Sequence, residues 1–161
     1  MGNIILTRKT ETSDKVWIKE VMLKSWNSEI VIASKPFNTL QLPGFIAEIE
    51  NKPVGILTYN IEDGRCEIVS LNSTVEKKGV GTMLINKIKQ FAQEEKYKSV
   101  WLVTSNDNID ALRFYQKRGF RITKIYPDAI EEARKLKPQI PEIGDYGIPM
   151  KDAFELEFNL S

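Results

Sequence analysis

The sequence contains no histidine among its 161 residues and only one cysteine, Cys66. The lack of histidine excludes catalytic triads that use an imidazole base, and it removes the commonest ligand of transition metals, so we expect no metal site. A single cysteine excludes an internal disulfide. It is typical of proteins of the reducing cytoplasm, where we expect this protein to work.

A strong charge imbalance and long apolar runs are also missing. The 23 lysines and arginines nearly balance the 22 aspartates and glutamates, so no strong field attracts nucleic acid. No apolar stretch approaches the about 20 residues that span a bilayer, and the N-terminus lacks the apolar segment of a signal peptide. We therefore expect neither nucleic acid nor a membrane as a partner.

Strand and helix patterns predict one mixed sheet with helices on both faces, an α/β (mixed α+β) fold. Asp63 and Gly64 form the turn of a predicted hairpin. The predicted strands span residues 3–9, 45–50, 54–61, 65–72, 99–104, 120–126 and 154–160. The predicted helices start near residues 13, 80, 106 and 128. Residues 28–35 fit a short strand, residues 36–42 fit a short helix or turn, and residues 137–150 form a long loop.

Gly79 and Gly81 stand at the start of the helix predicted near residue 80. The apolar face of this helix consists of Val80, Met83, Leu84, Ile88 and Phe91. Backbone N–H groups at a helix start have no partner within the helix, and the helix dipole adds positive potential there, so the two glycines predict an anion site. By itself the pair fits a simple turn equally well. It is neither a phosphate-binding P-loop nor a full dinucleotide fingerprint, because the further glycines are missing.

A second motif occupies residues 106–120. Asn108 is placed to cap a helix, and Ala111 and Tyr115 share one face of it at i and i+4. Gly119 ends the helix directly before Phe120. Taken in this order, the two motifs point to a known family.

The pattern resembles that of the GCN5-related N-acetyltransferases, the GNAT superfamily. It reads Asn108-x-x-Ala111-x-x-Phe114-Tyr115-x-x-x-Gly119-Phe120 and follows the glycine helix. The resemblance implies a GNAT-like, mostly antiparallel twisted sheet, in one acyl-CoA N-acyltransferase domain over residues 1–161. Glu76 departs from the family, which usually has Gln or Arg there; Lys77 and Lys78 offset its charge.

The resemblance implies acetyl-CoA as co-substrate. Its pyrophosphate is then bound near Lys78, Gly79, Val80, Gly81 and Thr82. Its pantetheine arm is bound by Leu71, Asn72, Ser73, Asn108 and Ala111. Tyr115 takes the position that protonates the leaving thiolate, and a phenol suits this role because it keeps its proton at neutral pH.

The resemblance further implies direct transfer to a primary amine, a small molecule or a peptide, in a ternary complex. Glu67 is a candidate base, although a solvent-facing strand residue fits it equally; Glu48 and Asp145 are weaker candidates. Cys66 fits packing better than a covalent role. The long loop offers Glu142, Asp145 and Tyr146 to hold the ammonium group of the acceptor, because loops on a rigid scaffold often carry specificity.

Other functions stay open at this point. One alternative is a non-catalytic acyl-CoA-binding or sensor module on the same fold, and another is an unrelated nucleotide-binding α/β domain. Peptide N-termini, polyamines and aminoglycosides all remain open as acceptors. The family resemblance also makes a homodimer possible.

Overall fold

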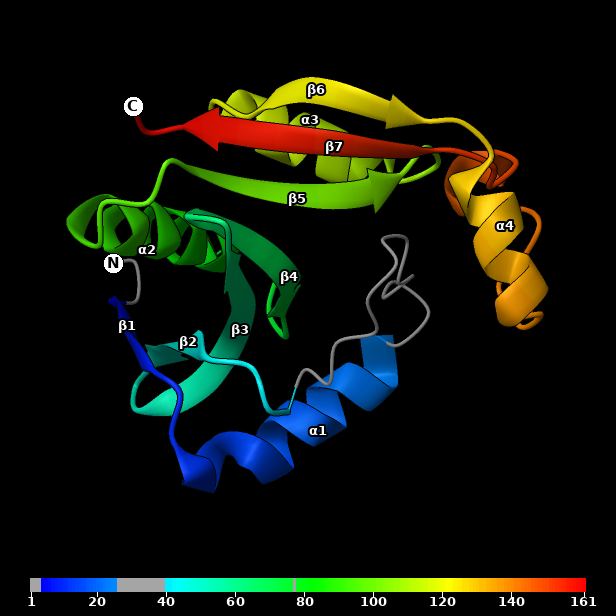
Figure 1. Ribbon diagram of the computed structural model, residues 1–161. Helices are drawn as coiled ribbons and strands as arrows, with labels where there is room; N and C mark the ends of the chain where they lie inside the picture. Colours follow the sequence, from blue (N-terminus) through cyan, green and yellow to red (C-terminus); the bar gives the residue numbers. More distant parts are fainter. Residues whose placement is uncertain (1–3, 26–39, 77) are drawn as a thin grey trace. The chain divides into compact units, whose positions relative to one another are not determined.

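The computed structural model describes residues 4–25, 40–76 and 78–161 (Figure 1). The predictions for residues 28–35, for most of residues 36–42 and for Lys77 therefore lie outside the described residues. The strands are β1 (Ile5–Lys9), β2 (Gly44–Ile49), β3 (Lys52–Glu62), β4 (Arg65–Ser73), β5 (Ser99–Ser105), β6 (Arg121–Tyr126) and β7 (Ala153–Asn159). The helices are α1 (Lys15–Ser25), α2 (Val80–Glu94), α3 (Ile109–Lys117) and α4 (Ala129–Leu136), with 3-10 turns η1 (Thr12–Asp14) and η3 (Asp145–Gly147).

The strands follow the order β1-β2-β3-β4-β5-β7-β6 in a seven-stranded sheet. From β1 to β4, each strand pairs antiparallel with the next strand along the chain, and β6 pairs antiparallel with β7. This confirms the predicted mixed, mostly antiparallel sheet. The described chain divides into two compact units, the first with residues 4–25, 40–76, 78–100 and 160–161, the second with residues 101–159.

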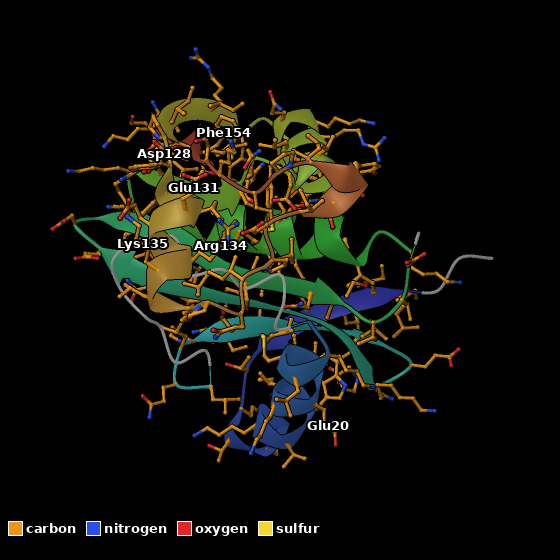
Figure 2. All side chains as sticks on the ribbon, turned by 90° about the vertical axis from the view of Figure 1, so that its right-hand side faces the viewer. Glu20, Asp128, Glu131, Arg134, Lys135 and Phe154 are labelled. Carbon is orange, nitrogen blue, oxygen red and sulfur yellow. The ribbon has the colours of Figure 1, made fainter. Side chains whose placement is uncertain are left out.

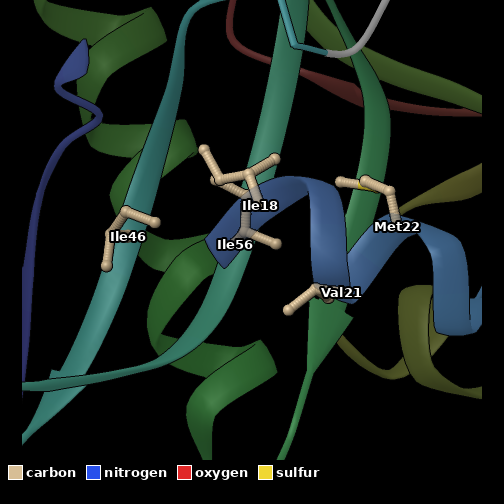
Figure 3. Close-up of a cluster of buried hydrophobic side chains, with 5 residues drawn as sticks. All are labelled: Ile18, Val21, Met22, Ile46 and Ile56. Carbon is tan, nitrogen blue, oxygen red and sulfur yellow. The ribbon is translucent and has the colours of Figure 1, made fainter. Parts of the chain in front are cut away.

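In the first unit, α1 covers one face of the strands. Its apolar residues Ile18, Val21 and Met22 pack against Ile46 of β2 and Ile56 of β3 (Figure 3). Together they form a buried cluster that fixes the helix on this face.

Helix α2 covers the other face of the same strands. The ring of Phe91 lies 5.5 Å from that of Phe45 and 5.1 Å from that of Tyr59, measured between centroids. Phe45 precedes Ile46 in β2, and successive residues of a strand point to opposite faces. The buried residues of α2 are Val80, Leu84, Ile85, Ile88 and Ala92. Met83, predicted on the apolar face, is instead 37% exposed, because it lies on the flank of the buried stripe.

Strand β4 carries a bulge. Thr58 of β3 pairs with Ser70, whereas the next residue, Tyr59, pairs with Ile68, so Val69 is an extra residue on β4. The buried hydroxyls of Thr58 and Ser70 lie 2.6 Å apart. Such an extra residue bends a strand and increases its twist, here shortly before the C-terminal end of β4.

In the second unit, aromatic rings connect α3 to the strands. Tyr115 of α3 lies 5.4 Å from Phe120, and Phe120 lies 5.7 Å from Phe158 of β7, between ring centroids. The Asn108 side chain accepts a 3.3 Å hydrogen bond from the Ala111 N–H, which confirms the predicted helix cap.

Helix α4 packs on a separate cluster of the second unit, formed by Ile130, Ile140, Met150 and Ala153. From this helix Arg134 (Figure 2) donates hydrogen bonds to the carbonyl oxygens of Ile140, Pro141 and Met150, at 3.1, 2.8 and 2.9 Å. One guanidinium group thus holds both ends of the loop that follows α4.

Candidate functional site

Gly79 is the N-cap of α2 and has a left-handed backbone, with φ 78° and ψ 14°. Apart from Gly79 itself, its two chain neighbours and the adjoining helix backbone, no atom of the described residues lies within 4 Å of the position that a Cβ would take there. The Met83 N–H donates a 3.0 Å bond to the Gly79 carbonyl, so the amides before Met83 lie ahead of the hydrogen-bond ladder of the helix. This is the backbone arrangement of helix N-terminal anion sites.

The segment before the glycine turn is attached to β3. The backbone N–H and the hydroxyl of Thr74 both donate to the carbonyl oxygen of Val54, at 2.8 and 3.2 Å. Glu76 and Lys78 are exposed. The unusual carboxylate of Glu76 is therefore in water, where its charge is screened more strongly than in a buried site.

The three β4 residues predicted to contact the pantetheine arm follow the bulge directly. Leu71, Asn72 and Ser73 pair with Leu57, Ile56 and Gly55 of β3. Leu71 and Asn72 are half-buried, and Ser73 is exposed. Asn72 faces the side of the sheet that α1 covers, because its partner Ile56 contacts α1.

Glu67 and Cys66 lie on opposite faces of β4. Glu67 pairs with Asn60, whose side chain alternates onto the face covered by α1. Cys66 is fully buried, and burial raises the pKa of its thiol to about 12, with a smaller contribution from the charge of Glu67. A thiolate nucleophile is disfavoured there, and packing accounts for Cys66. Glu48, one of the two weaker candidate bases, accepts a 3.0 Å hydrogen bond from Arg8.

The Asn108 side chain uses both ends of its amide within the second unit. Its Nδ2 donates to the Thr104 hydroxyl at 3.1 Å, and its Oδ1 accepts from the Ala111 N–H. These contacts fix the turn between β5 and α3. The amide thus acts as a structural cap.

Tyr115 is buried, with 7% of its surface exposed. Its ring packs edge-to-face against Phe114 and Phe120, at centroid distances of 5.1 and 5.4 Å. Burial raises the pKa of Tyr115 well above its ordinary value, and the charge of Arg118 lowers it only in part. The phenol therefore keeps its proton at neutral pH.

The loop residues predicted to bind the acceptor are all exposed, and two of them lie beside the start of α3. The Asp145 N–H donates to Asp107 Oδ2 at 3.0 Å, and the Tyr146 hydroxyl donates to Asp110 Oδ1 at 2.6 Å. This hydrogen bond to Asp110 is the main cause that raises the pKa of Tyr146. Glu142 contributes its carbonyl oxygen, which accepts from the Met150 N–H within the loop.

Two buried carboxylates of the second unit were not among the predicted site residues. Asp107 and Glu155 are 5% and 8% exposed. The Glu155 carboxylate accepts hydrogen bonds from Tyr126 at 3.1 Å and from Thr123 at 3.2 Å. The alternation of β7 indicates a solvent-facing residue at Glu155, so only the neighbouring strand reveals its burial.

Within residues 4–25, 40–76 and 78–161, no group of three or more histidine, cysteine, aspartate or glutamate side chains is arranged to hold a metal ion. The helices in this part of the chain are also too short or too polar to cross a membrane.

Comparison with known proteins identifies relatives over most of the chain. The chain is 44% identical over 131 residues to the uncharacterized protein YxbD of Bacillus subtilis (strain 168), which covers 80% of this chain and 82% of YxbD. It is 39% identical over 140 residues to the uncharacterized protein YdhI of the same organism, covering 86% and 88% of the two chains.

Solved structures share the fold at lower identity. A Bacillus subtilis acetyltransferase in complex with CoA has a TM-score of 0.75 at 21% identity, over 98% of this chain and 100% of its own. A GNAT family acetyltransferase from Elizabethkingia anophelis with acetyl-CoA bound has a TM-score of 0.73 at 22% identity, over 97% and 98%. The model of the acetyltransferase (GNAT) family matches residues 13–120, a range that includes both the glycine turn and the Asn108 motif. This chain therefore belongs to the acetyltransferase (GNAT) family.

Proposed function

We propose that this protein transfers the acetyl group of acetyl-CoA to a primary amine, by direct attack in a ternary complex. The observation that carries the proposal is the open, left-handed turn at Gly79, which presents the start of an amphipathic helix to an anion. Family membership and the CoA and acetyl-CoA bound by the structural neighbours support it.

In this proposal, the cofactor contacts the residues that the family resemblance implies. The pyrophosphate binds the amides around Gly79, where the helix dipole favours negative charge. The pantetheine arm pairs with the backbone of β4 after the bulge. The proposed cofactor-binding residues are Leu71, Asn72, Ser73, Lys78, Gly79, Val80, Gly81, Thr82, Asn108, Ala111 and Tyr115.

The chemistry follows from the two reactants. The neutral amine nitrogen attacks the thioester carbonyl carbon, and a backbone amide of β4 stabilises the oxyanion that forms. Collapse of this intermediate breaks the C–S bond and leaves an amide and the CoA thiolate. The amine proton passes to Glu67 or to water, and Tyr115 supplies a proton to the thiolate.

The raised pKa of Tyr115 bears on this role in two ways. It keeps the phenol protonated until the thiolate forms, but it also makes the phenol a weaker acid. A CoA thiolate formed beside Tyr115 is desolvated by the same burial, so the pKa of the CoA thiol is raised as well. The difference between the pKa of the phenol, which donates the proton, and the pKa of the thiol is therefore smaller than burial of the phenol alone would make it.

A second candidate function is a non-catalytic acyl-CoA-binding or sensor module. The packing of Tyr115 between Phe114 and Phe120 favours it, because this packing alone accounts for the aromatic ring. In that case the protein binds acetyl-CoA without turning it over.

One experiment separates the two functions. Calorimetry measures acetyl-CoA binding, and thiol release is followed with spermidine, kanamycin and a short peptide with an α-amino group as acceptors. Binding with amine-dependent thiol release supports the transferase. Binding without release from any acceptor indicates the sensor, and the lack of acetyl-CoA binding contradicts both functions.

A further inference from the structure

We propose that Asp107 is a positioning residue that fixes the acceptor loop, residues 142–150, to the turn between β5 and α3. This inference rests on the proposed function, in which the acceptor loop carries Asp145 and Tyr146. All residues of this argument belong to the second unit.

Asp107 uses each of its carboxylate oxygens for a different segment. Its Oδ1 accepts a 2.5 Å hydrogen bond from the Ser105 hydroxyl at the end of β5. Its Oδ2 accepts a 3.0 Å bond from the Asp145 N–H in the acceptor loop. Only 5% of Asp107 is exposed, so water competes little for these bonds.

Gly144 lets the loop approach this carboxylate. A Cβ on Gly144 would lie 2.1 Å from Asp107 Oδ2 and 2.7 Å from Met150 Cγ, closer than any real contact. Any larger residue would force the loop and the Asp107 carboxylate apart, whichever of the two moves. The attachment of the acceptor loop to Asp107, which we call the joint, therefore depends on both Gly144 and Asp107.

Asn106 and Asp110 hold the same loop from either side of Asp107. The Asn106 side chain donates to the Pro149 carbonyl of the loop at 2.9 Å. It also accepts from the N–H groups of Lys151 and Asp152, which directly follow the loop, each at 3.0 Å. On the other side, Asp110 accepts from the Tyr146 hydroxyl. Asp107 is the buried centre of this set of contacts.

Asn108, the helix cap proposed to contact the cofactor, follows Asp107 directly in the chain. The acceptor loop is thus attached to the same turn that positions Asn108, and it is preformed before any amine binds. Since a small misplacement of binding groups weakens a substrate complex, loosening this joint should affect the amine more than acetyl-CoA.

The test uses Asp107→Ala, Asp107→Asn and Gly144→Ala in the full chain. Asp107→Ala removes both bonds, and Gly144→Ala forces the loop and the carboxylate apart while the sequence keeps Asp107. In Asp107→Asn, the amide oxygen still accepts from the Asp145 N–H and the amide nitrogen can donate to the Ser105 hydroxyl, so this variant should keep the loop attached. Asp14→Asn is the matched control, because Asp14 is similarly buried, at 7% exposed, but lies in the first unit.

Kinetics use the most active of the three acceptors named above. We expect Asp107→Ala and Gly144→Ala to raise the KM for the amine roughly tenfold or more, with the dissociation constant of acetyl-CoA unchanged. In the variant that combines Asp107→Ala with Gly144→Ala, the rise in the amine KM should be smaller than the product of the two single effects, since both changes break the same attachment. Asp107→Asn and Asp14→Asn should stay near the wild-type KM.

Hydrogen exchange gives a second readout that needs no acceptor. Amides of residues 144–150 should exchange faster in Asp107→Ala and Gly144→Ala, but not in Asp107→Asn. Unchanged exchange, an unchanged amine KM, or an equal loss of affinity for both substrates would each overturn the inference. If the wild-type protein acetylates none of the amines, the proposed function is contradicted. The hydrogen-exchange measurement then still tests whether Asp107 and Gly144 hold the acceptor loop.

Discussion

The Tyr146 hydroxyl donates a 2.6 Å hydrogen bond to Oδ1 of Asp110, although 36 positions separate the two residues. Tyr146 has a φ of 58°, a left-handed backbone that is uncommon for a bulky residue. Because 70% of the Tyr146 surface is exposed, the side chain is held by its hydrogen bond to Asp110 and by the backbone conformation of the loop, and not by burial. An exposed aromatic ring kept in one orientation is suited to contact a ligand.

We expect Tyr146→Phe to raise the KM for the amine roughly tenfold and to leave that for acetyl-CoA unchanged, because the hydroxyl fixes the orientation of the ring through its bond to Asp110. Asp145→Asn should act in the same direction, since it removes a charge that attracts an ammonium group. Steady-state kinetics with one substrate saturating measures each constant. Tyr97→Phe, in the first unit, serves as the control, and the acceptor-binding role of the loop is refuted if amine kinetics stay at wild-type values in both loop variants.

Gly81→Glu should abolish acetyl-CoA binding while the fold remains. The substitution puts a carboxylate in the first turn of α2, where the amides are proposed to hold the pyrophosphate. Calorimetry measures the affinity, and circular dichroism checks the fold. Asn86→Glu adds the same charge to an exposed position in the middle of α2 and should bind normally. Wild-type affinity in a folded Gly81→Glu protein would contradict the anion site.

Tyr115→Phe should lower kcat about 100-fold or more, because it removes the proton that the thiolate receives. The ring contacts with Phe114 and Phe120 are kept, so the affinity for acetyl-CoA should change little. Measurements need saturating substrates and conditions in which the chemical step limits the rate. Undiminished turnover would leave Tyr115 with a packing role only.

Cys66→Ala should keep activity within a few-fold of wild type and cost about 1 kcal/mol of unfolding free energy, because it leaves a small cavity under α2. Urea unfolding measures the stability. Mass spectrometry of the protein with acetyl-CoA provides the opposing test: an acetylated Cys66 that goes on to form product would replace direct transfer by a covalent route.

The stability of the first unit should depend on acid pH through Asp14. Two hydrogen bonds from Arg8, both 2.8 Å, lower the pKa of Asp14 below its ordinary value of 3.8. A lowered carboxyl pKa contributes stability that is fully present above the unfolded value and is lost as the pH falls through the folded value.

Asp14→Asn should therefore cost about 1 to 2 kcal/mol of unfolding free energy at pH 7, and this difference should shrink as the pH falls below 3.8. Urea unfolding at a series of pH values measures it. A difference between wild type and variant that stays constant down to the lowest pH would show that the ion pair contributes nothing through titration.

The sequence predicts those features that depend on neighbouring residues. Asp63 and Gly64 both have positive φ, at 54° and 73°, as the turn chemistry of this pair indicates. The cap formed by Asn108 is equally local. The strand and helix positions follow from hydrophobic periodicity, and the family pattern then identifies the fold.

Features that depend on distant pairing are not visible in the local pattern. Nothing in residues 154–160 indicates that β7 lies between β5 and β6. The same strand alternates regularly, which predicts an exposed Glu155, yet hydroxyls of β6 reach its carboxylate. Asp107 shows the same limit, because its partner Asp145 lies 38 positions later.

The bulge at Val69 makes the number of residues in β4 part of the proposed cofactor site. Deleting Val69 would restore regular pairing, with Ser70 still opposite Thr58 and Ile68 still opposite Tyr59, so the strand would lose the bend and the added twist that precede Leu71, Asn72 and Ser73. Adding or deleting a residue elsewhere in β4 would shift the pairing with β3 by one position. Substitutions at Val69 change only one side chain. Among relatives of this protein, insertions and deletions should therefore be excluded from β4 even at positions where many different amino acids are accepted.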